Sequence, residues 1–123
     1  SPDGEMVEIH RDITIDQVAS LRFCLDLRGN EKEPSGAKSL YFVMQPLSRR
    51  FVVADSEYTD ATFNLNGTPQ PFTTKVDVNY VKGRPVRTSC VEVTPSKPLR
   101  HGAYRMGIYC EGKLIEVKRL NIY

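Results

Sequence analysis

Residues 86–123 read VRTSCVEVTPSKPLRHGAYRMGIYCEGKLIEVKRLNIY, and this stretch decides the fold. Apolar residues recur two apart in Val91-Glu92-Val93 and again in residues 104–108. A period of two is typical of a strand with one buried face, because successive side chains point to opposite sides. Prolines and glycine interrupt the pattern in residues 95–102, and Glu111-Gly112 forms a turn between the last two apolar runs. We therefore predict three strands, Val86–Thr94, Tyr104–Cys110 and Lys113–Ile122.

The last of these strands changes phase along its length. Ile115 and Val117 share one parity, whereas Leu120 and Ile122 share the other. One extra residue restores a single apolar face, so we predict a β-bulge near Lys118-Arg119.

The rest of the chain continues the pattern of short strands. We expect strands in residues 19–27, 40–44, 61–65 and 73–81, and we expect residues 49–54 to form the hairpin partner of residues 40–44. Asn66–Pro71 is a strong turn signal. About eight strands at roughly ten-residue spacing predict an all-β fold, an Ig-like antiparallel β-sandwich.

The hairpin from Gly102 to Ile115 resembles the closing hairpin of many bacterial extracytoplasmic Ig-like sandwich domains, in which a P-x-G-x-Y-x-V-x-Y-x-x-G-x-L type of run ends the fold. The resemblance is limited to this C-terminal hairpin. It implies a sandwich architecture and a periplasmic or extracellular location, and it carries no activity or functional residue to transfer.

Length and composition set the class of protein. We interpret the 123 residues as a linker or boundary segment, residues 1–5, followed by a single domain, residues 6–123. A net charge of +2 is too small to favour nucleic acid as a partner. No run approaches the ~20 apolar residues of a transmembrane helix.

Three cysteines leave at least one thiol outside any intramolecular disulfide. The alternation of apolar residues places Cys24 and Cys90 on outward faces and Cys110 on a core face. If a disulfide forms, we expect Cys24–Cys90, whose spacing is like that of the Ig framework bridge, although that bridge joins inward-facing residues. The alternative is three free thiols.

No motif predicts catalysis, a metal or a cofactor. The two histidines, His10 and His101, lie far apart in the sequence, and no nucleophile motif or pair of metal-binding cysteines accompanies them. The carboxylates of Asp55, Glu57 and Asp60 lack the order of a calcium loop, so we interpret residues 55–60 as a solvated acidic loop. We expect a protein that is not an enzyme.

One strand suggests an interaction surface. Residues 40–44 are apolar at every position, so this strand is either central and covered on both faces or uncovered and available to another chain. The two interpretations stand equal. The candidate interaction residues are Tyr41, Phe42, Val43, Met44, Phe51, Val52, Tyr58 and Tyr109.

The expected function follows from these observations. We predict a non-enzymatic binding or structural module that acts through contacts with a protein partner or through self-association. The alternative is a carbohydrate-binding module that stacks sugars on exposed tyrosines, namely Tyr58 or Tyr109.

Overall fold

The computed structural model describes residues 20–24, 26–27, 34–48, 50–87, 90–97 and 99–122. These ranges contain strands and connecting segments, and they contain no helix that could span a membrane. Residues 1–5, interpreted above as a linker, lie outside them. The strands are β1 (Leu21–Phe23), β2 (Asp26–Leu27), β3 (Gly36–Pro46), β4 (Thr62–Leu65), β5 (Thr68–Pro71), β6 (Thr74–Tyr80), β7 (Val86–Arg87), β8 (Val91–Val93), β9 (Gly102–Cys110) and β10 (Lys113–Ile122).

A four-stranded antiparallel sheet forms the centre of the molecule, with the strand order β10-β9-β3-β6. β3 is an inner strand that pairs with β9 on one side and with β6 on the other. Its run of apolar residues fits this place, because an inner strand covered on both faces has no polar face. Of the two interpretations of residues 40–44, the central one is therefore correct.

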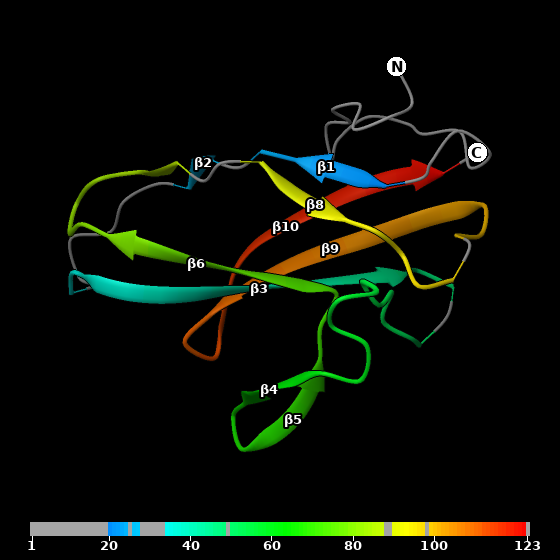
Figure 1. The fold of residues 1–123 in the computed structure, drawn as a ribbon, viewed down its shortest axis with the longest axis horizontal. Coiled ribbons are helices and arrows are strands. Elements are labelled where there is room, and N and C mark those ends of the chain that lie inside the picture. The colour runs from blue at the N-terminus through cyan, green and yellow to red at the C-terminus, as the bar shows by residue number, and fades with distance from the viewer. Residues whose placement is uncertain are drawn as a thin grey trace.

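The second layer is a short antiparallel arm. β1 pairs with β8, and β2 pairs with β7. Figure 1 shows β1 and β8 above the large sheet. Leu21, Val91 and Val93 pack from this arm onto the sheet. β1 and β2 are two parts of one expected strand, residues 19–27, and β7 and β8 are two parts of another, residues 86–94. When each of these pairs is counted once, the described residues hold eight strands. The all-β sandwich is confirmed.

The main core lies between these layers. Alternate residues of β3, β9 and β10 point into it, and their side chains are almost completely removed from solvent. The contributors from the large sheet are Leu40, Phe42, Met44, Tyr104, Met106, Ile108, Leu120 and Ile122.

A second, smaller core covers the opposite face of β3. The β4–β5 hairpin lies below the large sheet in Figure 1, and Phe63 of β4 and Phe72 pack against Val43 and Tyr41. The rings of Tyr41 and Phe63 stack with centroids 4.4 Å apart. Both faces of β3 are thus covered by segments of the same chain.

Two tight turns have the backbone that their sequences predict. Asn66 and Gly67 have φ angles of 53° and 86°, and Glu111 and Gly112 have φ angles of 51° and 76°. Two consecutive residues with positive φ form the type I′ turn that matches the twist of a β-hairpin. The first turn is shorter than predicted, because Thr68–Pro71 forms β5, a hairpin-edge strand in which proline is tolerated.

The β-bulge occurs in β10 but not at the predicted position. The register with β9 shifts between Leu114 and Glu116, so Ile115 is the extra residue. After the bulge, Leu120 and Ile122 point into the core, whereas the side chain of Val117 points away from it and is 40% exposed. Val117 therefore belongs to the solvent face and not to the core face that the prediction gave it.

Residues 51–54 do not form the predicted hairpin strand. Their link to β3 is a hydrogen bond from the Val53 N–H to the Met44 carbonyl, 2.8 Å long. The chain then turns toward the end of β8, where the Ser56 N–H donates to the Thr94 carbonyl at 2.9 Å. This segment connects the two layers and leaves β6 as the neighbour of β3.

Tyr104 fixes the loop that enters β9. Its buried hydroxyl donates to the Arg100 carbonyl at 2.7 Å and accepts from the Arg100 N–H at 3.1 Å. A tyrosine that bonds back to the backbone a few residues upstream is a known corner of Greek-key sandwiches.

We expect Tyr104→Phe to lower the free energy of unfolding by about 1–3 kcal/mol, because it leaves the Arg100 backbone groups without their partner. Chemical denaturation measures this change. Tyr109→Phe, which removes the hydroxyl of a half-buried ring on the same strand, is the matched control with a change below about 0.5 kcal/mol. Equal losses in the two variants would contradict the role of the corner.

Candidate functional site

Three of the predicted interaction residues are core residues. The exposed fractions of Phe42, Val43 and Met44 are 0%, 2% and 0%. Tyr41 is half-buried beneath Phe63. The prediction of an exposed surface at residues 41–44 is corrected for a physical reason: the arm covers one face of β3 and the β4–β5 hairpin covers the other.

Phe51 and Val52 line a cleft of about 750 Å³ at one end of the sandwich. Residues 51–54 and 59–60 line this cleft, together with Ser96, Lys97, Leu99, Arg100 and Tyr104. Phe51 is 44% exposed, and Asp60 faces this space together with Lys97 and Arg100. The cleft brings together the rings of Phe51 and Tyr104 and charges of both signs, and none of its described lining residues is a histidine or a cysteine.

Tyr58 and Tyr109 do not form a flat platform. Both rings are half-buried and pack against the second core, Tyr58 on Phe72 and Tyr109 on Phe63, each with centroids 5.5 Å apart. Burial raises the pKa of the Tyr58 phenol above its ordinary value of 10.0, and the Glu57 carboxylate raises it further. Among the aromatic side chains that the structure describes, Phe51 alone is classed as exposed.

The acidic loop is only partly solvated. Asp55 is buried, and its carboxylate accepts hydrogen bonds from the Glu57 N–H at 2.9 Å and from the Thr94 N–H at 3.4 Å. These bonds tie the segment between the layers to the end of β8. Asp55 therefore has a structural role, which its position in an acidic run did not indicate.

An apolar surface that the sequence reasoning missed lies on β10. Leu114, Ile115 and Val117 are 45%, 43% and 40% exposed. Leu114 pairs with Tyr109 across the sheet, and both side chains lie over Gly107. We call Tyr109, Leu114, Ile115 and Val117 the apolar edge. A bulge placed at Ile115 would have revealed it, because this position sends Val117 to the solvent face.

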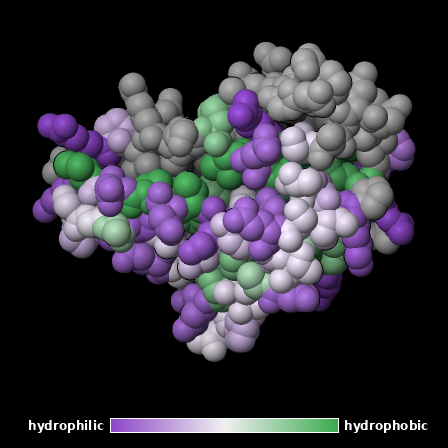
Figure 2. Space-filling view, viewed as in Figure 1, coloured by the Kyte–Doolittle hydropathy of each residue, from purple (hydrophilic) through white to green (hydrophobic). Residues whose placement is uncertain are grey.

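The apolar edge stands out because exposed apolar residues are scattered elsewhere. On the face shown in Figure 2, apolar side chains form small areas separated by hydrophilic ones. Leu47, Phe51 and Val81 are also exposed, but none of them lies in a strand: Leu47 and Phe51 belong to the connection after β3, and Val81 follows β6. A contiguous apolar group on an edge strand is a better candidate for a contact surface than a single exposed residue.

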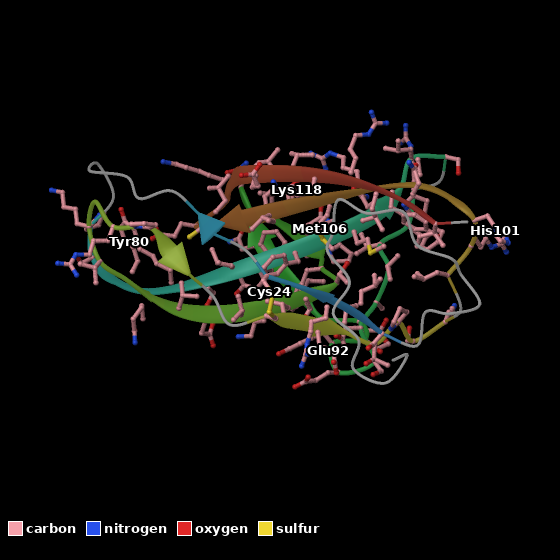
Figure 3. All side chains as sticks on the ribbon, turned by 90° about the horizontal axis from the view of Figure 1, so that it is seen from above. Cys24, Tyr80, Glu92, His101, Met106 and Lys118 are labelled. Atoms are coloured by element: carbon pink, nitrogen blue, oxygen red, sulfur yellow. A yellow bond between two sulfur atoms is a disulfide. The ribbon has the colours of Figure 1, made fainter. Side chains whose placement is uncertain are left out.

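Cys24 and Cys90 form a disulfide. Continuing the register of Leu21–Phe23 with Val91–Val93 puts these cysteines directly opposite each other, on the outward face that also carries the ion pair of Arg22 and Glu92. Figure 3 shows Cys24 at the end of β1 and Glu92 on β8. The predicted pairing is confirmed, and so is the outward direction, since the bridge joins neighbouring strands of one arm and not two sheets.

The described residues contain no group of three or more histidine, cysteine or carboxylate side chains that could hold a metal ion. His101 is exposed at one end of the molecule, opposite the end that carries Tyr80 (Figure 3). His10 lies outside the described residues. Cys110, half-buried at the end of β9, is not part of the disulfide.

Comparisons with known proteins identify the class of domain. The family model of the Domain of unknown function DUF8428 matches residues 9–122. Since the match spans most of the chain, this protein belongs to that family. The curated proteins gave no match, and the solved structures gave none.

The disulfide predicts the number of thiols in the native protein. We expect titration in denaturant without reductant to find one thiol per chain, that of Cys110, because Cys24 and Cys90 are oxidised. The variant Cys110→Ser is the control and has none. Three thiols in protein isolated without reductant would contradict the bridge.

Proposed function

We propose that this domain is a non-enzymatic binding or structural module that acts through protein–protein contacts in a periplasmic or extracellular compartment. The observation that carries the proposal is the apolar edge, which combines exposed side chains with a strand at the border of the large sheet. An edge strand offers backbone hydrogen-bonding groups to another chain, and apolar side chains beside it supply the contact area.

The composition of this surface fits a protein contact. Tyr109 and Leu114 form its centre over Gly107. Arg105 of β9 pairs with Arg119 of β10, two residues along the strands from the pair of Gly107 and Val117. Tyrosine and arginine are enriched in protein interfaces, where an apolar centre is surrounded by polar residues.

The opposite border of the sheet lacks this character. β6 presents Lys75, Asp77 and Asn79, and the Lys75 ammonium lies 3.8 Å from the Asp77 carboxylate. Neither valine of β6 is exposed, whereas β10 exposes Leu114, Ile115 and Val117. This contrast favours β10 over β6 as the contact strand.

The Ig-like character of the domain is part of the proposal. It is supported by the antiparallel sandwich and by the bond of Tyr104 to Arg100, a corner that Ig-like domains share. The disulfide differs from the Ig framework bridge, because Cys24 and Cys90 lie on neighbouring strands of one arm.

The proposed compartment is supported by the same disulfide. Disulfides form and persist in oxidising environments and are rare in the reducing cytosol. A bridge on an outward face, with Cys24 exposed, is accessible to cellular reductants, so it is stable only in an oxidising location.

The carbohydrate-binding alternative has less support. It requires exposed, flat aromatic rings, whereas Tyr58 and Tyr109 are half-buried against the rings of the second core. No specific observation favours it over protein contacts.

We expect the double variant Leu114→Lys with Val117→Lys to lose binding to its natural protein partner by about tenfold or more, because charge replaces the apolar centre of the contact. The measurement is quantitative capture from the extracytoplasmic fraction of the source organism, with immobilised wild type and variant compared. Leu47→Lys, at an equally exposed leucine of a distant turn, is the matched control.

Support requires a protein that wild type and the Leu47→Lys control retain and that the β10 variant loses. Retention of the same proteins by all three would mean that the apolar edge is not the contact surface.

A further inference from the structure

The hydrogen bonds of β3 show which backbone groups of β10 point away from β9, to the side where no other described strand pairs with it. The Phe42 carbonyl accepts from the Thr73 N–H, and the Met44 N–H donates to Thr73 Oγ1, both on the side of β3 away from β9. Because backbone groups alternate along an antiparallel strand, Val43 directs its N–H and C=O toward Gly107 of β9.

The same alternation continues into β10. Gly107 uses its backbone groups toward β3, so its neighbours Met106 and Ile108 direct theirs toward Lys118 and Glu116. Val117 and Arg119 then direct their N–H and C=O groups to the open side. An independent contact agrees, since the Val117 N–H donates to Oε1 of Glu116 at 3.3 Å and not to β9.

We propose that a second copy of this chain occupies the open side of β10, with the two β10 strands antiparallel about a two-fold axis at Val117. The inference rests on the proposed function, since it names the partner that the apolar edge contacts. A residue-centred axis is required, because only then do the outward backbone groups of one strand meet those of the other.

The charged residues of β10 favour Val117 as the position of the two-fold axis. An axis at Val117 places Glu116 opposite Lys118 of the partner subunit, and the symmetry makes this attraction twice. An axis at Glu116, at Lys118 or at Arg119 places two identical charges directly opposite each other, which destabilises a strand pair. Only the Val117 register in this part of β10 is self-complementary.

The side chains around this axis fit the pairing. Glu116 and Lys118 share the parity that faces the arm, whereas Val117 faces the other side and meets the partner's Val117. Figure 3 shows Lys118 on β10, the outermost strand of the sheet. In the dimer, the Val117 N–H exchanges its bond to Glu116 for one to the partner's Val117 carbonyl, and the Glu116 carboxylate turns to the partner's Lys118.

Such a contact joins two four-stranded sheets into one continuous sheet but has a small area. Interfaces of this kind are weak, so the dimer is reversible and depends on concentration. Sedimentation equilibrium over a concentration series measures it. We expect the wild type to pass from monomer to dimer as its concentration rises.

Charge reversal tests the register. We expect Glu116→Lys alone, and Lys118→Glu alone, each to weaken the dimer about tenfold, because two attractive pairs become two repulsive ones. The double variant Glu116→Lys with Lys118→Glu restores the pairs in reverse and returns the dissociation constant to near the wild-type value. Failure of the double variant to restore association overturns the Val117 register.

A backbone variant tests the strand pairing itself. Val117→Pro removes an N–H that the β9–β10 ladder does not use, so the fold tolerates it while the dimer is lost. Asn79→Pro, at the matching outward position of β6, is the control and leaves the dimer unchanged. Circular dichroism checks the fold of each variant, and the charge-reversal series decides the matter if a proline variant does not fold.

The outcomes separate this inference from the proposed function. A wild type that stays monomeric throughout the series overturns the second copy as the partner, and capture through the apolar edge would still support the proposed function. A dimer that is unaffected by Glu116→Lys and by Val117→Pro overturns the β10 pairing. A dimer that responds to both variants, and is rescued by the charge swap, supports it.

Discussion

The burial of β3 on both faces is the constraint on which the rest of this structure depends. An apolar strand cannot leave either face in water without a cost of ~25 cal/mol for each Å² of apolar surface exposed. The chain meets this requirement with two separate covers. The arm of β1 and β8 packs over Phe42 and Met44, and the β4–β5 hairpin packs over Tyr41 and Val43. The disulfide of Cys24 and Cys90 fastens the two halves of an arm whose strands are too short to be stable alone.

The position of β3 also determines where the molecule can be contacted. With β9 on one side and β6 on the other, β10 becomes a border strand. The hairpin covers the face over β3, but Leu114 and Val117 remain exposed on β10 beyond it. The bulge at Ile115 turns Val117 outward and keeps Leu120 and Ile122 in the core. One irregular residue thus separates the part of β10 that stabilises the fold from the part available for contact.

The sequence predicted the fold class better than the surface. Period two in residues 104–108 and the turn at Glu111-Gly112 are local signals, and the structure has a hairpin there. Whether residues 40–44 lie in the middle of a sheet or at its edge depends on pairing with residues that are distant in the chain, which periodicity does not encode. For this reason the sequence leaves Phe42 and Met44 equally open to a core position and to an interaction surface. The position of the bulge was also ambiguous, since an extra residue anywhere between Leu114 and Leu120 restores the core phase of Leu120.

The outward bridge of Cys24 and Cys90 was predictable in direction from alternation alone, because each cysteine neighbours apolar residues of the opposite parity.

Amide hydrogen exchange of the native monomer tests the central role of β3 most directly. The Val43 N–H lies in the ladder with β9 beneath two covers, so we predict that it exchanges only through global unfolding and is among the slowest amides of the domain. The amide of Ser48, in the exposed turn after β3, serves as the internal reference and exchanges faster. Exchange of Val43 at a rate near that of Ser48 would contradict a central strand covered on both faces.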